Sequence, residues 1–159
     1  GTGLRIARQL GHTIHDTYPA LTPLIAEGTP HSNLAGVSLN VTMRATEAKR
    51  RYQVHGGFLF THRGYSGPAV LNISHIAVRS RLKSQPRPPI MVQWCELDTG
   101  QWDDVLRTQG TAQLAPTLRR YIPARVAEML IEEAHITPDR RLSELKREER
   151  TRIVHALTP

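Results

Sequence analysis

The residue types best suited to chemistry gather in one stretch, which spans residues 56–74 and reads GGFLFTHRGYSGPAVLNIS. A short apolar run at Phe58–Phe60 predicts a buried strand. Apolar residues return at helical spacing from Val70 onward, and Pro68 suits a first helical turn because its missing N–H needs no partner there. Between these segments stand hydroxyl, imidazole and guanidinium groups with two glycines. The stretch therefore predicts a strand, a polar glycine-rich turn and a helix.

A helix that begins at Pro68 would direct its first amide N–H groups back toward this turn, with Ser66 or Gly67 as its cap. Such an end favours an anion or an oxygen-rich ligand, because the unpaired amides and the helix dipole both carry partial positive charge. The simpler interpretation is that the glycines only permit a tight strand-to-helix corner. Spacing alone does not separate the two.

Catalytic and metal-binding sets are not evident elsewhere in the chain. The eight histidines are dispersed, and we interpret them as surface or structural residues, because no carboxylate or cysteine is arranged to complete a ligand set. Glu132-Glu133 and Glu148-Glu149 are interpreted as solvated helix faces rather than acid/base pairs. We expect Trp94 and Trp102 to pack the core and the junction between two parts of the chain. No catalytic residue and no metal ligand is predicted.

The expected strands are short and close together in the sequence, which favours antiparallel pairing. Val37 to Arg44 alternates apolar and polar residues, as a half-buried strand does. We expect Gly56-Gly57 to turn a strand at 52–55 into the next at 58–61. The remaining expected elements are an edge strand near residues 18–24, a strand at 90–97, and helices at 2–12, 68–82, 103–108, 117–121, 123–134 and 146–157.

The predicted fold class is α+β, a small antiparallel β-barrel with one long helix followed by a small helical bundle. We divide the chain into an entry helix or hinge (1–12), a β-barrel part (13–102) and a helical part (103–159).

The composition is basic, with a net charge of +7. Such a charge can indicate a polyanionic partner. The basic residues are nevertheless scattered, and the densest cluster, Lys49-Arg50-Arg51, is three residues long, so specific nucleic-acid binding is not expected. No apolar run approaches the roughly 20 residues that cross a bilayer, and no secretory signal is seen. Cys95 is the only cysteine. We expect a cytoplasmic protein without a membrane partner.

The stretch LFTHRGYSGPAVL resembles a signature of the FAD-dependent oxidoreductases related to aminoacetone oxidase and the BaiN-type flavoproteins. The segments GLRIARQLGHTI (3–14), YPALTPL (18–24) and Leu34–Leu39 resemble the same family, and the helical C-terminal part does so more weakly. In that family the FAD-binding fold is assembled from sequence before and after an insertion. The insertion is a β-barrel and a small helical bundle that lie over the flavin, and the resemblance implies that this chain is that insertion.

The function implied by the resemblance is that of a substrate-side or cap domain of an FAD-dependent oxidoreductase, NAD(P)H-linked or not. FAD and the oxidoreductase activity would belong to the parent protein, with no FAD bound to this chain and no catalysis by it alone. The implied partners are the host FAD-binding domain of the same polypeptide and a small-molecule substrate. The two chain ends should then lie close together. The residues expected to face substrate or cofactor are Thr61, His62, Arg63, Gly64, Tyr65, Ser66 and Gly67.

Two other functions stay open. A basic β-barrel that binds RNA would carry exposed aromatic residues interleaved with its basic residues. A purely structural insert would mediate subunit contact or oligomerisation.

Overall fold

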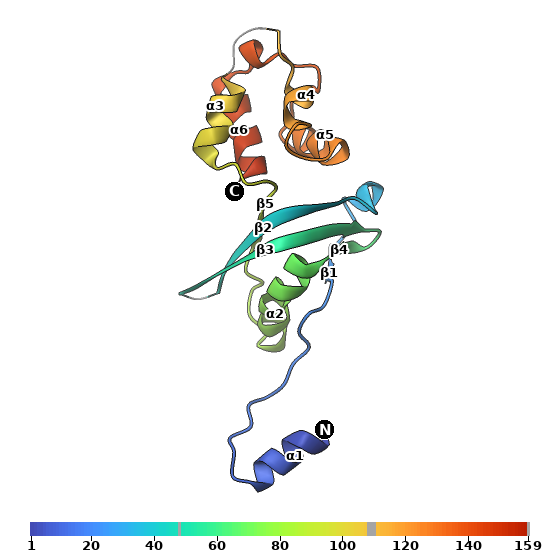
Figure 1. Cartoon of the computed structure of the whole chain (residues 1–159), viewed down its shortest axis with the longest axis vertical. Coiled ribbons are helices and arrows are strands. Elements are labelled where there is room, and N and C mark those ends of the chain that lie inside the picture. The colour runs from blue at the N-terminus through green and yellow to red at the C-terminus, as the bar shows by residue number, and fades with distance from the viewer. Residues whose placement is uncertain (48, 108–110, 159) are drawn as a thin grey trace.

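The computed structural model describes residues 1–47, 49–107 and 111–158. Its centre is a five-stranded antiparallel sheet in the order β1-β4-β3-β2-β5. Helix α2 (Pro68–Leu82) covers one face of the sheet (Figure 1). Beyond the other face lies a helical unit that consists of α3, α4, α5 and α6. The strands are β1 (Leu24–Ile25), β2 (Ser38–Glu47), β3 (Arg50–Thr61), β4 (Gly64–Ser66) and β5 (Ile90–Gln93). The other helices are α1 (Thr2–Gln9), α3 (Thr99–Leu106), α4 (Leu114–Leu118), α5 (Ala124–Glu133) and α6 (Arg147–Leu157), with 3-10 turns η1 (Ser32–Leu34) and η2 (Leu142–Glu144).

The predicted α+β class is confirmed, but the sheet is not closed into a barrel. β1 pairs with β4 and β5 pairs with β2, so these two short strands are the edges of the sheet. The predicted turn at Gly56-Gly57 is wrong, because β3 runs straight through the glycine pair in register with β2. Gly56 lies opposite Val41 and Gly57 opposite Asn40. The glycines serve the packing of a helix instead.

That packing is a close approach of the start of α2 to β3. A Cβ atom on Gly57 would lie 3.3 Å from Cδ of Pro68, and one on Gly67 would lie 2.6 Å from the carbonyl oxygen of Gly57. Gly67 also has a φ of 99°, a conformation that side chains with a Cβ rarely adopt. The first turn of α2 therefore lies directly on β3, with Ala69 and Val70 completely buried.

The aromatic core of the sheet continues into the helical unit. The ring of Trp94 is 5.4 Å from that of Phe58 and 5.8 Å from that of Phe60. Its indole N–H donates to the carbonyl of Ala156 at 3.1 Å, which fixes the end of α6 to the sheet. Trp102 on α3 is completely buried. The predicted core and junction roles of the two tryptophans are confirmed.

Charged side chains link the elements of the helical unit around an apolar interior. Arg150 of α6 donates to a carboxylate oxygen of Asp103 on α3 at 2.9 Å. Glu149 accepts from the backbone N–H of Lys146 at 2.8 Å and from Arg140 at 2.7 Å, and these bonds lower the pKa of its carboxyl group. Within the residues described, no helix combines the length and the apolar character that crossing a membrane requires.

Helix α1 stands apart from the rest of the chain. None of its residues is buried, and the segment that joins it to β1 has no regular structure over residues 12–23. Figure 1 places α1 at one extremity of the molecule, far from the end of α6. The two ends are therefore not adjacent, and the expectation that they lie close together is wrong for this structure.

Replacing Gly67 with alanine should lower the free energy of unfolding by about 3 kcal/mol, because the new Cβ meets a strained φ and the Gly57 carbonyl together. Chemical denaturation followed by circular dichroism measures this. Gly100→Ala on α3 is the matched control, because its Cβ would meet only a carboxylate oxygen of Asp98 at 3.4 Å. The control should be neutral or more stable by up to ~1 kcal/mol. Equal losses in both variants would contradict the seating of α2 on β3.

Candidate functional site

A cavity of about 530 Å³ opens between the two edge strands, β1 and β5. All five strands and α2 contribute side chains to its lining. Its volume lies within the range of about 300–1,000 Å³ that small-molecule sites occupy. The space between the unpaired edges of the sheet is therefore large enough for a ligand.

The floor of the cavity is aromatic and apolar. Phe58 from β3, Met43 from β2 and Trp94 after β5 are 2%, 2% and 8% exposed and line its inner surface. Tyr65 from β4 lies against Phe58 with ring centroids 5.3 Å apart. Planar or apolar groups are the ligand chemistry that such a floor favours.

One side of the cavity is polar and is formed by His31 and Tyr65, with Glu133 behind His31. The Tyr65 hydroxyl and Nδ1 of His31 are 2.8 Å apart, and Nε2 of His31 lies 2.9 Å from a carboxylate oxygen of Glu133 on α5. A carboxylate only accepts, so Nε2 carries the hydrogen. In the neutral imidazole Nδ1 is then an acceptor and the Tyr65 hydroxyl donates to it. Burial, and secondarily the charge of Glu133, raises the pKa of the Tyr65 phenol.

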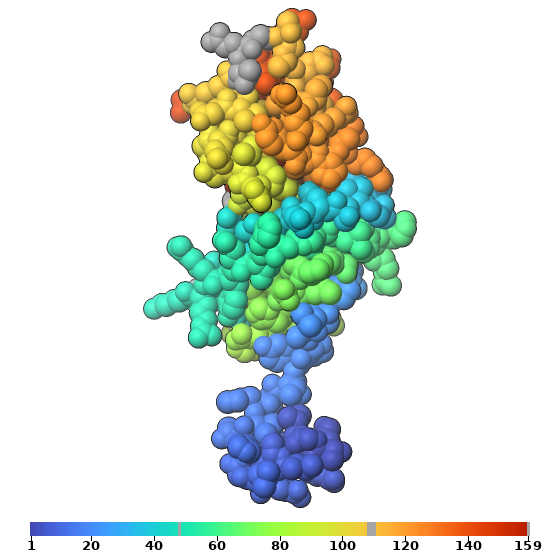
Figure 2. Space-filling view, in the orientation of Figure 1, coloured from blue at the N-terminus to red at the C-terminus, as the bar shows by residue number. Residues whose placement is uncertain are grey.

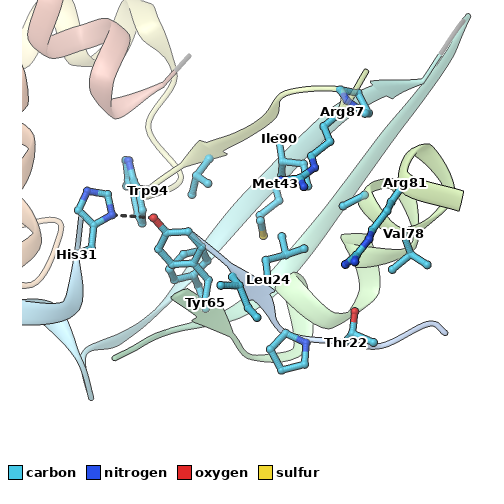
Figure 3. A pocket seen from close by; sticks show the side chains of 16 residues that line it. Thr22, Leu24, His31, Met43, Tyr65, Val78, Arg81, Arg87, Ile90 and Trp94 are labelled. Carbon is cyan, nitrogen blue, oxygen red and sulfur yellow. Dashed lines mark hydrogen bonds between the residues drawn. The ribbon is translucent and has the colours of Figure 1, made fainter. Parts of the chain in front are cut away.

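The opposite side of the cavity is basic. Arg81 extends from α2 and Arg87 from the segment before β5, and Figure 3 shows both across the cavity from His31 and Tyr65. A guanidinium nitrogen of Arg87 lies 3.7 Å from a carboxylate oxygen of Glu27. Both side chains are largely exposed, so this ion pair is weak. Arg81 is exposed and forms no ion pair with any residue described. This side can therefore accept an anionic group.

The structure distributes the seven residues singled out from the sequence over a turn and a short strand. Thr61 ends β3 and its hydroxyl donates to the carbonyl of Gly64 at 3.0 Å. His62 and Arg63 form the turn and are exposed. Gly64, Tyr65 and Ser66 form β4, and Gly67 is the N-cap residue directly before α2. Tyr65 alone of the seven lines the cavity. A substrate-facing role for the others stays a prediction.

The start of α2 does not fit the pyrophosphate of a dinucleotide. FAD-binding folds hold this group at an open helix N-terminus that follows a strand of a parallel sheet. Here the sheet is antiparallel and the first turn of α2 is packed on Gly56 and Gly57. This first turn does not line the cavity. The start of α2 is therefore not a dinucleotide-binding helix N-terminus of this kind.

Sequence patterns did not single out three side chains of the cavity, His31, Arg81 and Arg87. Glu133 lies outside the cavity, and the sequence predicts it only as part of a solvated helix face. His31 and Glu133 are 102 residues apart in the chain and meet only through the fold. Arg81 lies in the last turn of α2 and Arg87 lies among prolines, so neither position carries a local signal. In the described ranges, no three His, Cys, Asp or Glu side chains are grouped so that they could hold a metal ion.

The raised pKa of Tyr65 leads to a test at alkaline pH. Because the folded state holds this proton more tightly than the unfolded state, the resulting stability is complete below the ordinary tyrosine pKa and is lost as the pH rises through the folded value. Absorbance titration should show one of the four tyrosines ionising later than the others. Tyr65→Phe should remove that late step. Its persistence in the variant would assign it to another tyrosine.

Comparison with known proteins finds a curated relative and a family model that are similar to this chain. A relative from Haemophilus influenzae (strain ATCC 51907 / DSM 11121 / KW20 / Rd), a "Ribosomal RNA dihydrouridine synthase", is 41% identical over 75 residues. The match covers 46% of this chain and 18% of that protein. The family model described as "HI0933-like protein barrel and H2TH domain" matches residues 18–159, which include the whole sheet and the helical unit. The chain therefore belongs to the HI0933-like family, a family of the HI0933/BaiN-type FAD-dependent oxidoreductases.

Proposed function

We propose that this chain is the substrate-side domain of an FAD-dependent oxidoreductase of this family. The proposal does not depend on whether NAD(P)H supplies the electrons. The observation that carries the proposal is the ligand-sized cavity between β1 and β5, with its aromatic floor and its polar and basic sides. The flavin and its phosphates would be held outside this chain. This domain would bind the substrate and keep water away from it.

The second part of the proposal concerns the substrate class, which we take to be RNA. The name of the Haemophilus influenzae relative supports this, although the match spans a small share of that protein. The net charge of +7 agrees with a polyanionic partner. With RNA as its substrate, a substrate-side domain is also an RNA-binding module.

The β2–β3 hairpin is the surface that favours RNA most directly. β2 and β3 extend beyond the body of the molecule, as Figures 1 and 2 show. Lys49, Arg50 and Arg51 are exposed near the end of this hairpin, and none of them forms an ion pair with a described residue. The three-residue cluster is short in sequence, but the fold presents it on a projecting arm. Such an arm can reach phosphates without a steric conflict with the rest of the domain.

The triple variant Lys49→Ala, Arg50→Ala, Arg51→Ala should weaken binding of this chain to a structured fragment of ribosomal RNA by at least about 10-fold. Each lost phosphate contact should also flatten the slope of log K against log salt by about 0.7, hence by about 2 for three contacts. Fluorescence anisotropy at several salt concentrations measures both quantities.

The matched control removes three exposed cations from the helical unit, Arg120→Ala, Arg141→Ala and Arg147→Ala. Its salt slope should change by less than half as much. Equal effects of the two triple variants would mean diffuse attraction rather than binding through the hairpin. No binding of the wild-type chain in low salt would overturn RNA as the substrate class.

The activity of the longer protein can be tested in cells. Cells whose single gene copy encodes the hairpin variant should contain less dihydrouridine in ribosomal RNA than cells with the wild-type gene, because the substrate would bind more weakly. Mass spectrometry of digested RNA measures the modification, and immunoblotting checks that protein levels are equal. Unchanged dihydrouridine at equal protein levels would contradict a substrate-binding role for the hairpin.

A further inference from the structure

We propose that the cavity between β1 and β5 binds one unstacked uridine nucleotide, with its base on the aromatic floor and its phosphate at Arg81 and Arg87. The inference rests on the proposed function, because RNA is taken as the source of the nucleotide. It adds a binding site, an orientation and a base preference to that function.

The floor of the cavity provides a surface for a base. Phe58 and Trp94 line it from two different segments, and Tyr65 borders them with its hydroxyl on the polar side. Base–aromatic stacking is a main source of affinity for unpaired nucleotides, and proteins that read RNA commonly splay single bases out onto aromatic side chains. The three rings are held by mutual contacts at 5.3 and 5.4 Å between centroids, so the surface exists before a ligand arrives.

The polar side of the cavity selects a base that can donate a hydrogen bond from its ring. With a neutral imidazole, the hydroxyl hydrogen of Tyr65 is used toward His31, which Glu133 orients. The Tyr65 oxygen keeps a lone pair and can accept one further hydrogen bond. Uracil N3 and guanine N1 each present a ring N–H on the Watson–Crick edge, whereas the corresponding ring nitrogens of cytosine and adenine are acceptors. Of the two pyrimidines of RNA, uracil is therefore the better complement to this side.

The basic side of the cavity fixes the orientation. Arg81 and Arg87 lie across the cavity from Tyr65, as Figure 3 shows. Guanidinium groups bind phosphate oxygens through paired, charge-assisted hydrogen bonds. A nucleotide with its base edge at Tyr65 would carry its phosphate toward these arginines. This orientation, with the base inside the cavity and the phosphate outside, also leaves the RNA backbone at the surface of the domain.

Uridine 5′-monophosphate (UMP) is the probe, titrated into this chain by calorimetry together with its N3-methyl analogue, uridine and inorganic phosphate. The wild-type chain should bind UMP about 3- to 10-fold more tightly than the N3-methyl analogue, since the latter lacks one hydrogen bond. Tyr65→Phe should lower UMP affinity by the same factor and remove the difference between the two ligands. Arg81→Ala with Arg87→Ala should lower UMP affinity by about 10- to 100-fold and leave the affinity for uridine unchanged.

Control variants outside the cavity test whether the loss of UMP affinity is specific to the cavity residues. Tyr121→Phe removes a hydroxyl of a residue that does not line this cavity, and Arg120→Ala with Arg147→Ala removes two exposed charges from the helical unit. Neither should change UMP affinity by more than 2-fold. Equal affinity of the wild-type chain for UMP and its N3-methyl analogue would overturn the site, as would unchanged binding in the arginine variant. Loss of UMP binding in the longer family protein would mean that a segment of that protein fills the cavity, and would also overturn it.

The source of the nucleotide is tested separately with ribosomal RNA in place of UMP. If RNA binds the wild-type chain and the cavity variants equally well, RNA as the substrate class stands and the cavity inference fails. If UMP binds as expected but RNA does not bind, the cavity inference stands for a free nucleotide and RNA as the substrate class fails.

Discussion

The close approach of α2 to β3 is the constraint on which the site depends. Since neither Gly57 nor Gly67 has a Cβ, the helix begins in direct contact with the strand, and a side chain at either position would push it away. The distant part of the same helix carries Ala77, Val78 and Arg81 to the cavity. The glycine-rich corner thus acts through geometry: it sets the position of one wall of a space formed about three helical turns away.

The unclosed sheet follows from the sequence on either side of its edges. β1 is two residues long and is preceded by Pro23, while Pro88 and Pro89 stand immediately before β5. Proline has no N–H to donate, so these segments cannot extend a hydrogen-bonded ladder across the gap. Pro23 and Pro88 themselves line the cavity. The same residues that limit pairing of the two edges therefore help to form the space between them.

Local signals predicted the elements, and long-range contacts decided the site. The bounds of α2, Pro68 to Leu82, agree with the prediction because apolar spacing, a first-turn proline and a following proline-rich segment all act within the helix and its ends. The turn predicted at Gly56-Gly57 is wrong because glycine permits a turn but does not require one. The two glycines instead pack against α2, a helix that follows them in the sequence. Tyr65 stood out by its position in the motif. His31, which meets both Tyr65 and the distant Glu133, could not be found by any local pattern.

The polar side of the cavity avoids the cost that usually accompanies charge in an apolar space. The Glu133 side chain is 49% exposed and that of His31 is 20% exposed, so the carboxylate keeps much of its hydration while it orients the imidazole. Polarity then decreases in steps toward the interior, from a solvated carboxylate through a partly buried ring to a half-buried phenol. No isolated charge has to be buried next to Phe58 and Met43. Because Glu133 belongs to α5 and Tyr65 to β4, this chain of hydrogen bonds also joins the helical unit to the sheet. The helical unit is therefore a structural part of the site: without α5 to hold His31, the Tyr65 hydroxyl would lose the partner that fixes its direction.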